Sequence, residues 1–284
     1  MRIADYIALA DRIKERFDVA ALSVGGVAMW PFVRLLLFFA HEHKHLPALQ
    51  GQLKGEAYRT PIDAMGRDAP RASVDWSSAR IGPSAALLDR RTAAARPDIL
   101  VMQDPNDYLV PTDGSLVEPL RAGLREQFGE RYRINGLVSF HPLLAAASER
   151  RDPGLLHYAA NMRRPLLAEA DLARFMRKLG EIARLANAET GEATIVPADA
   201  LCWMQRMMGF VPAFTEILEH VRPRCLMMQS SLGLEKLALT VAAKRAGITV
   251  VDHQHGIFRA ESTLYVDWGG SSSGAIDPTP DVFW

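Results

Sequence analysis

The stretch that begins at Ile248 contains the residues of this chain best suited to chemistry. Four apolar or β-branched residues predict a short buried strand, which runs directly into polar residues. These are Asp252, His253, Gln254 and His255, followed by Gly256. Histidine has an ordinary pKa near ~6.5, so it can accept or release a proton at neutral pH. Ligands of open α/β sheets bind at the carboxyl ends of strands, where this run is expected to lie.

Two other predicted strands end in polar loops, after Gln103 and after Gln229. If all three strands are parallel, their loops meet at one edge of the sheet. That edge would gather Asp104, Asp107, Asp113, Ser230, Ser231, Asp252, His253, Gln254 and His255. Such side chains suit a sugar-like or otherwise hydroxyl-rich ligand, and a carboxylate or histidine among them could take a proton from an attacking hydroxyl.

The same residues also fit purely structural roles. Gly256 could close a plain turn by adopting positive φ, Asp113-Gly114 is a common turn dipeptide, and Ser230-Ser231 could cap a helix. The alternating His41, His43 and His45 resemble a metal-binding tract, but on a helix His43 would point away from the face that His41 and His45 share. CxxC, P-loop and GxGxxG motifs are absent, which argues against the classes of protein built on them.

Strands that alternate with helices predict an α/β fold, a Rossmann-like parallel sheet with flanking helices. The expected strands are Asp98–Gln103, Tyr132–Phe140, Arg224–Gln229 and Ile248–Val251. The expected helices are Ile3–Phe17, Pro31–His43, Leu116–Phe128, Leu166–Ala188, Ala198–Val221 and Leu234–Ala246. Pro212 should kink or split the fifth of these helices. Between them, residues 45–96 predict a long insertion with one short helix near Ser84–Arg91, and residues 141–164 an irregular basic segment.

Composition limits the function. The 284 residues carry 33 basic and 33 acidic side chains, and this zero net charge argues against a nucleic-acid partner. Cys202 and Cys225 fall in apolar patterns and are expected to be small core residues of a cytoplasmic protein. The apolar run Val27–Ala40 falls short of the roughly 18 residues of a spanning helix, so we expect a buried helix. Shallow membrane contact through Trp30 and its neighbouring phenylalanines is the alternative.

A series of short motifs resembles the N-terminal half of bacterial surface-polysaccharide glycosyltransferases of the GT-B type, as in capsule and O-antigen synthesis. The resemblance covers most of the chain in order and leaves the insertion without a counterpart. It rests on Trp30-Pro-Phe-Val-Arg34, the strand, acidic loop and helix from Asp98 to Leu124, Gln254-His255-Gly256, the loop Tyr265–Gly270 and Pro280-Asp-Val-Phe-Trp284. The Gln-His-Gly turn is also similar to the His-Gly turn of teichoic-acid polymerases.

The resemblance implies a sugar transfer that needs no metal and no cofactor beyond the nucleotide-sugar donor. His255 would be the catalytic residue, as a base toward the acceptor hydroxyl or a contact to donor phosphate. Substrate would be bound by Gln254, Gly256, Asp252, His253, Asp113, Ser230 and Ser231. The partner would be a glycan or lipid-linked glycan acceptor, reached by peripheral contact with the inner face of the cell membrane.

The resemblance also predicts the domain organisation. Residues 1–275 would be the Rossmann-like acceptor-side domain, and residues 276–284 the start of a C-terminal donor-binding domain that is missing. The chain would then be a fragment, inactive alone. One alternative is a non-enzymatic glycan-binding or assembly module with the same fold. Another is a flavodoxin-like enzyme for a phosphorylated metabolite, with a phosphate site at Ser230–Gly233.

Overall fold

The computed structural model describes residues 3–38, 85–87, 96–103, 118–139, 154–160, 165–191, 193–231, 233–253 and 274–284. The chain divides into two compact units, each built from three stretches. The helical unit comprises residues 1–75, 165–206 and 257–279, and the sheet unit residues 76–164, 207–256 and 280–284. The prediction that residues 1–275 form one domain stays a prediction.

The helical unit begins with an amphipathic helix, as predicted. Helix α1 (Ile3–Arg16) is followed by the short helix η1 (Val19–Ala21) and a hairpin of β1 (Ser23–Val24) and β2 (Val27–Ala28). The hairpin turns through Gly25 and Gly26, whose φ values of 56° and 73° favour glycine. The buried side chains of α1 are Tyr6, Leu9, Ala10 and Ile13, so Ala10 and Ile13 of the predicted stripe are buried, whereas the predicted Ile7 is half-buried.

A buried apolar helix follows the hairpin, over residues 30–38 of the described chain. Trp30 and Phe32, which the membrane alternative needs at the surface, are both buried. Arg34, at the end of the Trp-Pro-x-x-Arg motif, is also buried, and its carbonyl oxygen accepts a hydrogen bond from the Tyr6 hydroxyl at 3.1 Å. The motif therefore builds the core of the helical unit. Within the described residues, no helix is long and apolar enough to cross a membrane.

Two long helices, α7 (Glu169–Thr190) and α8 (Pro197–Val221), follow in the second half of the chain. Helix α7 buries Phe175, Leu179, Ile182, Ala183 and Ala186, and it ends at Gly191 with φ 70°. Helical periodicity predicts an apolar stripe of Leu172, Phe175, Met176, Leu179, Ile182 and Ala186, of which four are among these buried residues. Helix α8 continues through Pro212, so Pro212 does not split it, and the alternative of a kink stays a prediction. Its first residues, up to Arg206, belong to the helical unit and its remaining residues to the sheet unit.

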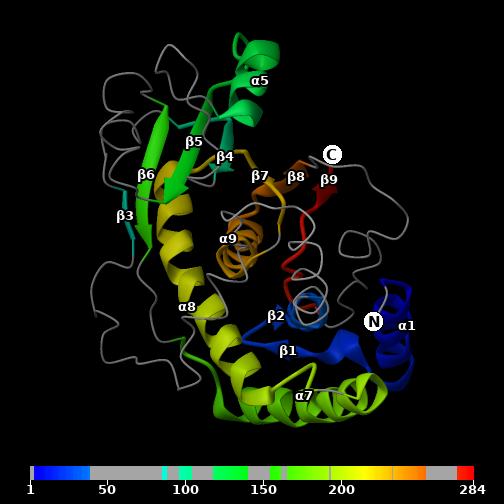
Figure 1. Ribbon diagram of the computed structural model, residues 1–284. Helices are drawn as coiled ribbons and strands as arrows, with labels where there is room; N and C mark the ends of the chain where they lie inside the picture. Colours follow the sequence, from blue (N-terminus) through cyan, green and yellow to red (C-terminus); the bar gives the residue numbers. More distant parts are fainter. Residues whose placement is uncertain are drawn as a thin grey trace, which may run out of the picture. The chain divides into compact units, whose positions relative to one another are not determined.

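The sheet unit contains a mostly parallel sheet, which confirms the predicted Rossmann-like α/β fold (Figure 1). Its strands, in chain order, are β3 (Ala85–Leu87), β4 (Ile99–Gln103), β5 (Ile134–Ser139), β6 (Leu155–Ala160), β7 (Cys225–Gln229), β8 (Thr249–His253) and β9 (Val282–Phe283). Across the sheet they lie in the order β3-β6-β5-β4-β7-β8-β9. Every neighbouring pair is parallel except β3 with β6. Numbered from β4, the parallel strands follow the doubly wound order 3-2-1-4-5-6.

Alternation along the strands divides the core between two faces of the sheet. On one face, Val101, Ile134 and Met227 form an apolar cluster with Leu124 of helix α5 (Pro119–Phe128). On the opposite face, the Tyr158 ring of β6 packs edge-on against Phe214 of α8, with ring centroids 5.5 Å apart. The Tyr158 hydroxyl also reaches Glu235 of helix α9 (Leu234–Arg245) at 3.0 Å. Helices thus pack on both faces, as a doubly wound sheet requires.

The unit of β7, α9 and β8 agrees closely with its prediction. The two strands are parallel neighbours in register, with Leu226 opposite Val250. Helix α9 ends just before Gly247, whose φ of 70° stops the helix as expected. Both cysteines are free, with Cys202 buried and Cys225 half-buried. Burial and the nearby charge of Asp281 raise the pKa of the Cys225 thiol, which keeps it protonated at neutral pH.

Two strands contradict the sequence-based expectations. Strand β6 lies in the segment 141–164, which was predicted to be irregular, and β3 lies where a short helix near Ser84–Arg91 was predicted. Alanine-rich residues at 85–87 favour helix locally, but β3 pairs with β6, and β6 pairs with β5. These backbone hydrogen bonds come from residues distant in the chain, so tertiary pairing overrides local propensity.

Leu100, in the central strand β4, tests the position of the core. The Leu100 side chain is fully buried, so Leu100→Ala should lower the free energy of unfolding by about 2–5 kcal/mol. The matched control is Leu166→Ala at a fully exposed site, which should change it by less than about 0.5 kcal/mol. Urea denaturation of both variants measures this. Equal stabilities would contradict the assignment of β4 to the core.

Candidate functional site

The doubly wound order locates one point of the sheet where ligands are expected. From β4 the chain winds outward through β5 and β6 on one side, and from β7 it winds through β8 and β9 on the other. The strands β4 and β7 are parallel neighbours at this reversal. Connections therefore leave their carboxyl ends in opposite directions, and ligands of open sheets bind there.

Three polar side chains line the carboxyl edge at this point, and we call them the polar row: Gln103, Gln229 and His253. Gln229 is the register partner of His253, and Met102 pairs with Met228, which places Gln103 beside Gln229. All three point to the side of the sheet that carries α5, because each lies two residues beyond a member of the apolar face. Those members are Val101, Met227 and Val251. The predicted meeting of these three strand ends is confirmed.

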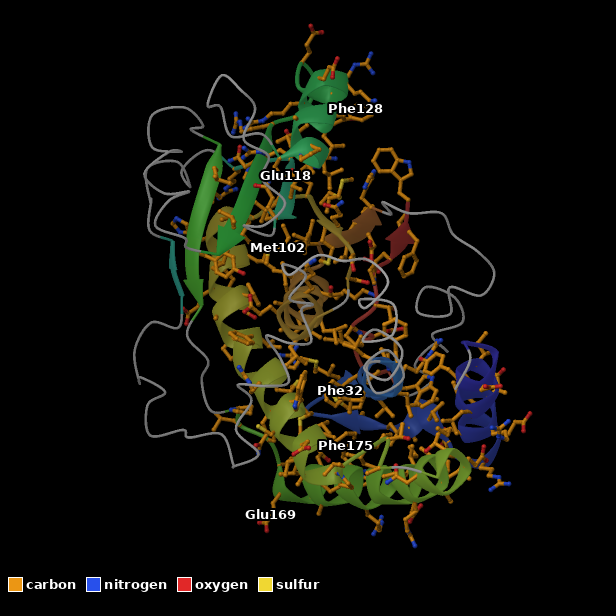
Figure 2. All side chains as sticks on the ribbon, in the orientation of Figure 1. Phe32, Met102, Glu118, Phe128, Glu169 and Phe175 are labelled. Atoms are coloured by element: carbon orange, nitrogen blue, oxygen red, sulfur yellow. The ribbon has the colours of Figure 1, made fainter. Side chains whose placement is uncertain are left out.

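Gln103 is tied to the start of α5. Its Nε2 donates to Oε2 of Glu118 at 2.7 Å, and both side chains are buried. Glu118 also caps α5, accepting from the backbone N–H of Leu120 at 3.0 Å and of Arg121 at 2.7 Å. In Figure 2, Glu118 lies where α5 begins, beside the sheet. The Gln103–Glu118 bond fixes the two ends of the segment 104–117, which contains the predicted Asp113.

The side chains of Gln103 and Arg121 leave no room for a larger residue at Gly136 of β5. A Cβ atom there would meet Oε1 of Gln103 at 2.2 Å and Nη1 of Arg121 at 2.6 Å. The same Nη1 donates to the carbonyl oxygen of Gly154 at 3.3 Å. Gln103, Glu118 and Arg121 therefore form a buried hydrogen-bonded network whose geometry depends on glycine at 136.

Asp252 holds the loop after β7. Its side chain is fully buried, with 0% exposure, and it accepts from the backbone N–H of Ser230 at 3.1 Å and of Ser231 at 2.6 Å. Ser230 has φ 60°, an unfavourable conformation for a residue other than glycine, which these bonds help to maintain. The predicted interpretation of Ser230-Ser231 as a helix cap is wrong. Helix α9 begins after Gly233 and has no side-chain cap bond.

Burial dominates the electrostatics of Asp252. Loss of hydration raises the pKa of its carboxyl above the ordinary value of 3.8, while the bonds from Ser231 and Ser230 and the charge of Lys236 act in the opposite direction. Lys236 itself donates from Nζ to the carbonyl oxygen of Gln229 at 2.8 Å. Loop, strand end and first turn of α9 are thus connected through buried or half-buried polar contacts.

His253 is the one predicted histidine of the run that the structure describes. Its imidazole is half-buried, and Nδ1 is buried without a hydrogen-bond partner among the described residues. The ring packs edge-on against Trp284, with centroids 5.5 Å apart and planes at 79°. An aromatic side chain therefore extends the polar row by one strand.

Several predicted residues lie outside the described part of the chain. These are Asp104, Asp107, Asp113, Gln254, His255 and Gly256, together with His41, His43 and His45. His255 follows β8 by two residues. Among the described residues, no group of three or more His, Cys, Asp or Glu side chains could hold a metal ion.

The sequence-based search missed the glutamines Gln103 and Gln229, the cap Glu118 and the aromatic Trp284. A signal for the glutamines exists, since each is the last residue of a strand whose preceding positions are apolar. No comparable signal marks Glu118, whose partner is 15 residues away.

Glu118→Ala removes both the helix cap and the partner of Gln103. We expect the free energy of unfolding to fall by about 2–3 kcal/mol, because one cap is lost and a buried amide is left unsatisfied. Glu126→Ala, at an exposed position of the same helix, is the control and should be nearly neutral. Thermal and urea unfolding measure the difference. A neutral Glu118→Ala variant would contradict the network.

Asp252→Asn should destabilise the chain in a pH-dependent way. The raised pKa means that native Asp252 binds its proton more tightly than the unfolded chain does. Ionisation as the pH rises above 3.8 and through the native pKa therefore lowers the stability of the wild type. The variant lacks this loss, so its deficit should be larger at about pH 4.5 than at about pH 7.5. Urea unfolding at both pH values measures this deficit. Asp11→Asn, at an exposed position, is the control for the effect of removing a carboxylate that is not buried. A deficit that grows with pH would contradict it.

Known proteins add no assignment to this geometry. No protein-family model, no curated protein and no solved structure matches the chain. The sheet edge itself, with its polar row and its buried carboxylate, is therefore the basis for a functional proposal.

Proposed function

We propose that this chain is the acceptor-side part of a GT-B-like glycosyltransferase, which moves a sugar from a nucleotide-sugar to a growing cell-surface polysaccharide. One observation supports this most directly. Beside the reversal point of a doubly wound sheet, the carboxyl edge carries two half-buried neutral polar side chains, Gln229 and His253, on one face. Amides and imidazoles donate and accept hydrogen bonds, which is what a hydroxyl-rich ligand needs.

The described edge suits a phosphorylated ligand less well. The backbone N–H groups of Ser230 and Ser231, where the flavodoxin-like alternative needs a phosphate, already bind the carboxylate of Asp252. A phosphate at that place would lose these donors and approach a buried acidic group. The ammonium group of Lys236 is bound to the carbonyl of Gln229. These contacts favour a neutral glycan over a phosphorylated metabolite.

A dinucleotide is also disfavoured. Rossmann domains bind the pyrophosphate on a glycine-rich turn after the first strand. Here the first strand of the doubly wound order, β4, is followed by Asp104-Pro-Asn-Asp107, which has no glycine and two carboxylates. The donor nucleotide is accordingly assigned to a second Rossmann-like domain of the complete enzyme.

In the proposed reaction, an acceptor hydroxyl oxygen attacks the anomeric carbon of the donor sugar. A new C–O bond forms, the bond from that carbon to the nucleotide phosphate breaks, and the nucleotide leaves with the bonding electrons. His255 takes the hydroxyl proton as general base, which is chemistry that a histidine supplies near neutral pH. His253 and Gln254 bind acceptor hydroxyls, and Asp252 keeps the neighbouring loop in position. A lipid-linked acceptor would bring the enzyme to the inner membrane face.

His255→Ala should abolish most sugar transfer by the complete enzyme, with a loss of about 10²–10⁴-fold in kcat, because a general base contributes about that much. Release of nucleotide and labelled product, measured with a panel of nucleotide-sugars and membrane-derived acceptor, gives the rate. His220→Ala, a histidine of α8 outside the proposed site, is the matched control and should retain activity.

The outcomes separate the alternatives. Full activity in His255→Ala would remove the proposed role of that residue. Glycan binding without any transfer would favour the non-enzymatic binding module. Absence of both glycan binding and transfer would contradict the proposed function as a whole.

A further inference from the structure

Trp284, the residue after β9, presents an exposed indole at the carboxyl edge of the sheet. The Trp284 side chain is 56% exposed, although its ring also contacts His253. Its backbone is held in place, since its N–H donates to the carbonyl oxygen of Asp252 at 2.9 Å. An anchored aromatic ring of this kind has little conformational entropy to lose when a ligand binds.

Strand β9 itself is fixed to β8 by both backbone and side chain. The N–H of Asp281 donates to the carbonyl of Val250 at 2.8 Å, and Oδ2 of Asp281 accepts from the N–H of Val250 at 2.8 Å. Lys244 of α9 adds an ion pair to Asp281 at 3.1 Å. The strand therefore sets the position of Trp284 as firmly as the sheet sets that of His253.

We propose that Trp284 is a sugar-binding platform, on which one pyranose ring of the glycan acceptor stacks while its hydroxyls bind His253 and Gln229. This subsite rests on the proposed function and extends the acceptor site to an edge strand. The subsite matches both the apolar face and the hydroxyl groups of a sugar. The apolar C–H face of a pyranose fits the indole, and the adjacent imidazole and amide fit its hydroxyl groups.

The composition of the row favours a sugar over an apolar peptide segment. An apolar side chain docking on Trp284 would cover His253 and Gln229, and their polar atoms would lose water without gaining hydrogen bonds from that side chain. A sugar supplies several hydroxyl groups at the spacing of neighbouring side chains. The row also presents amide and imidazole groups, which bind neutral hydroxyls without a charged partner.

Titration of the ¹⁵N-labelled chain with methyl β-D-glucopyranoside and with methyl N-acetyl-β-D-glucosaminide tests the subsite. The chain has five tryptophans, and Trp284→Phe identifies the indole N–H signal of Trp284. We expect that signal to shift on titration. Trp284→Ala should weaken binding by about 3- to 10-fold, and Trp284→Phe less, because phenylalanine keeps an aromatic face.

Tyr132→Ala is the matched control. Its ring is 43% exposed but precedes β5, at the opposite, amino-terminal edge of the sheet, so binding should not change. Glycoside binding that is equally strong in Trp284→Ala would overturn the platform and leave the proposed function standing. No shift of any signal with either glycoside would overturn both. If Trp284→Ala fails to fold, the response of the indole signal in the wild-type titration decides.

Discussion

The buried carboxylate of Asp252 determines how the strands of the sheet unit end. Asp252 lies on β8, and its carboxylate accepts hydrogen bonds from two consecutive backbone N–H groups of the loop after β7. Its backbone carbonyl oxygen accepts a hydrogen bond from the N–H of Trp284. One residue thus connects three neighbouring segments at the carboxyl edge. Burying a carboxylate is costly, as its raised pKa indicates, and the bonds from the loop offset that cost. Such a cost is tolerated most readily where backbone geometry matters for function.

The second constraint is the winding of the sheet. Because the chain reverses its direction of winding between β4 and β7, the ends of these strands lie at the point where open sheets bind ligands. The bond between Gln103 and Glu118 organises one side of that point, and Asp252 organises the other. Glu118 holds the backbone at the start of α5, and Asp252 holds the backbone of the loop after β7. The neutral side chains that remain at the edge are Gln229, His253 and Trp284. The proposal of an uncharged glycan ligand rests on this division.

Much of the fold follows from local patterns. Apolar runs ending in polar residues predicted β4, β5, β7 and β8, and glycines marked the turn between β1 and β2 and the end of α9. The site was predictable in part, because parallel strands must bring Gln103, Gln229 and His253 to one edge. Strands β3 and β6 were not, since the alanines of β3 favour helix locally and both strands form through pairing with other segments of the chain.

The sequence by itself determined the class of the protein, an alternation of helices and strands with histidines and an aspartate after a buried strand. Only the tertiary structure decided what these polar residues do. It directed Asp252 inward as a structural anchor, and it joined Glu118 to Gln103 across 15 residues of chain. It also placed Trp284 against His253. The physical reason is that periodicity reports which face is buried, whereas the partner of a buried polar group depends on which strands become neighbours.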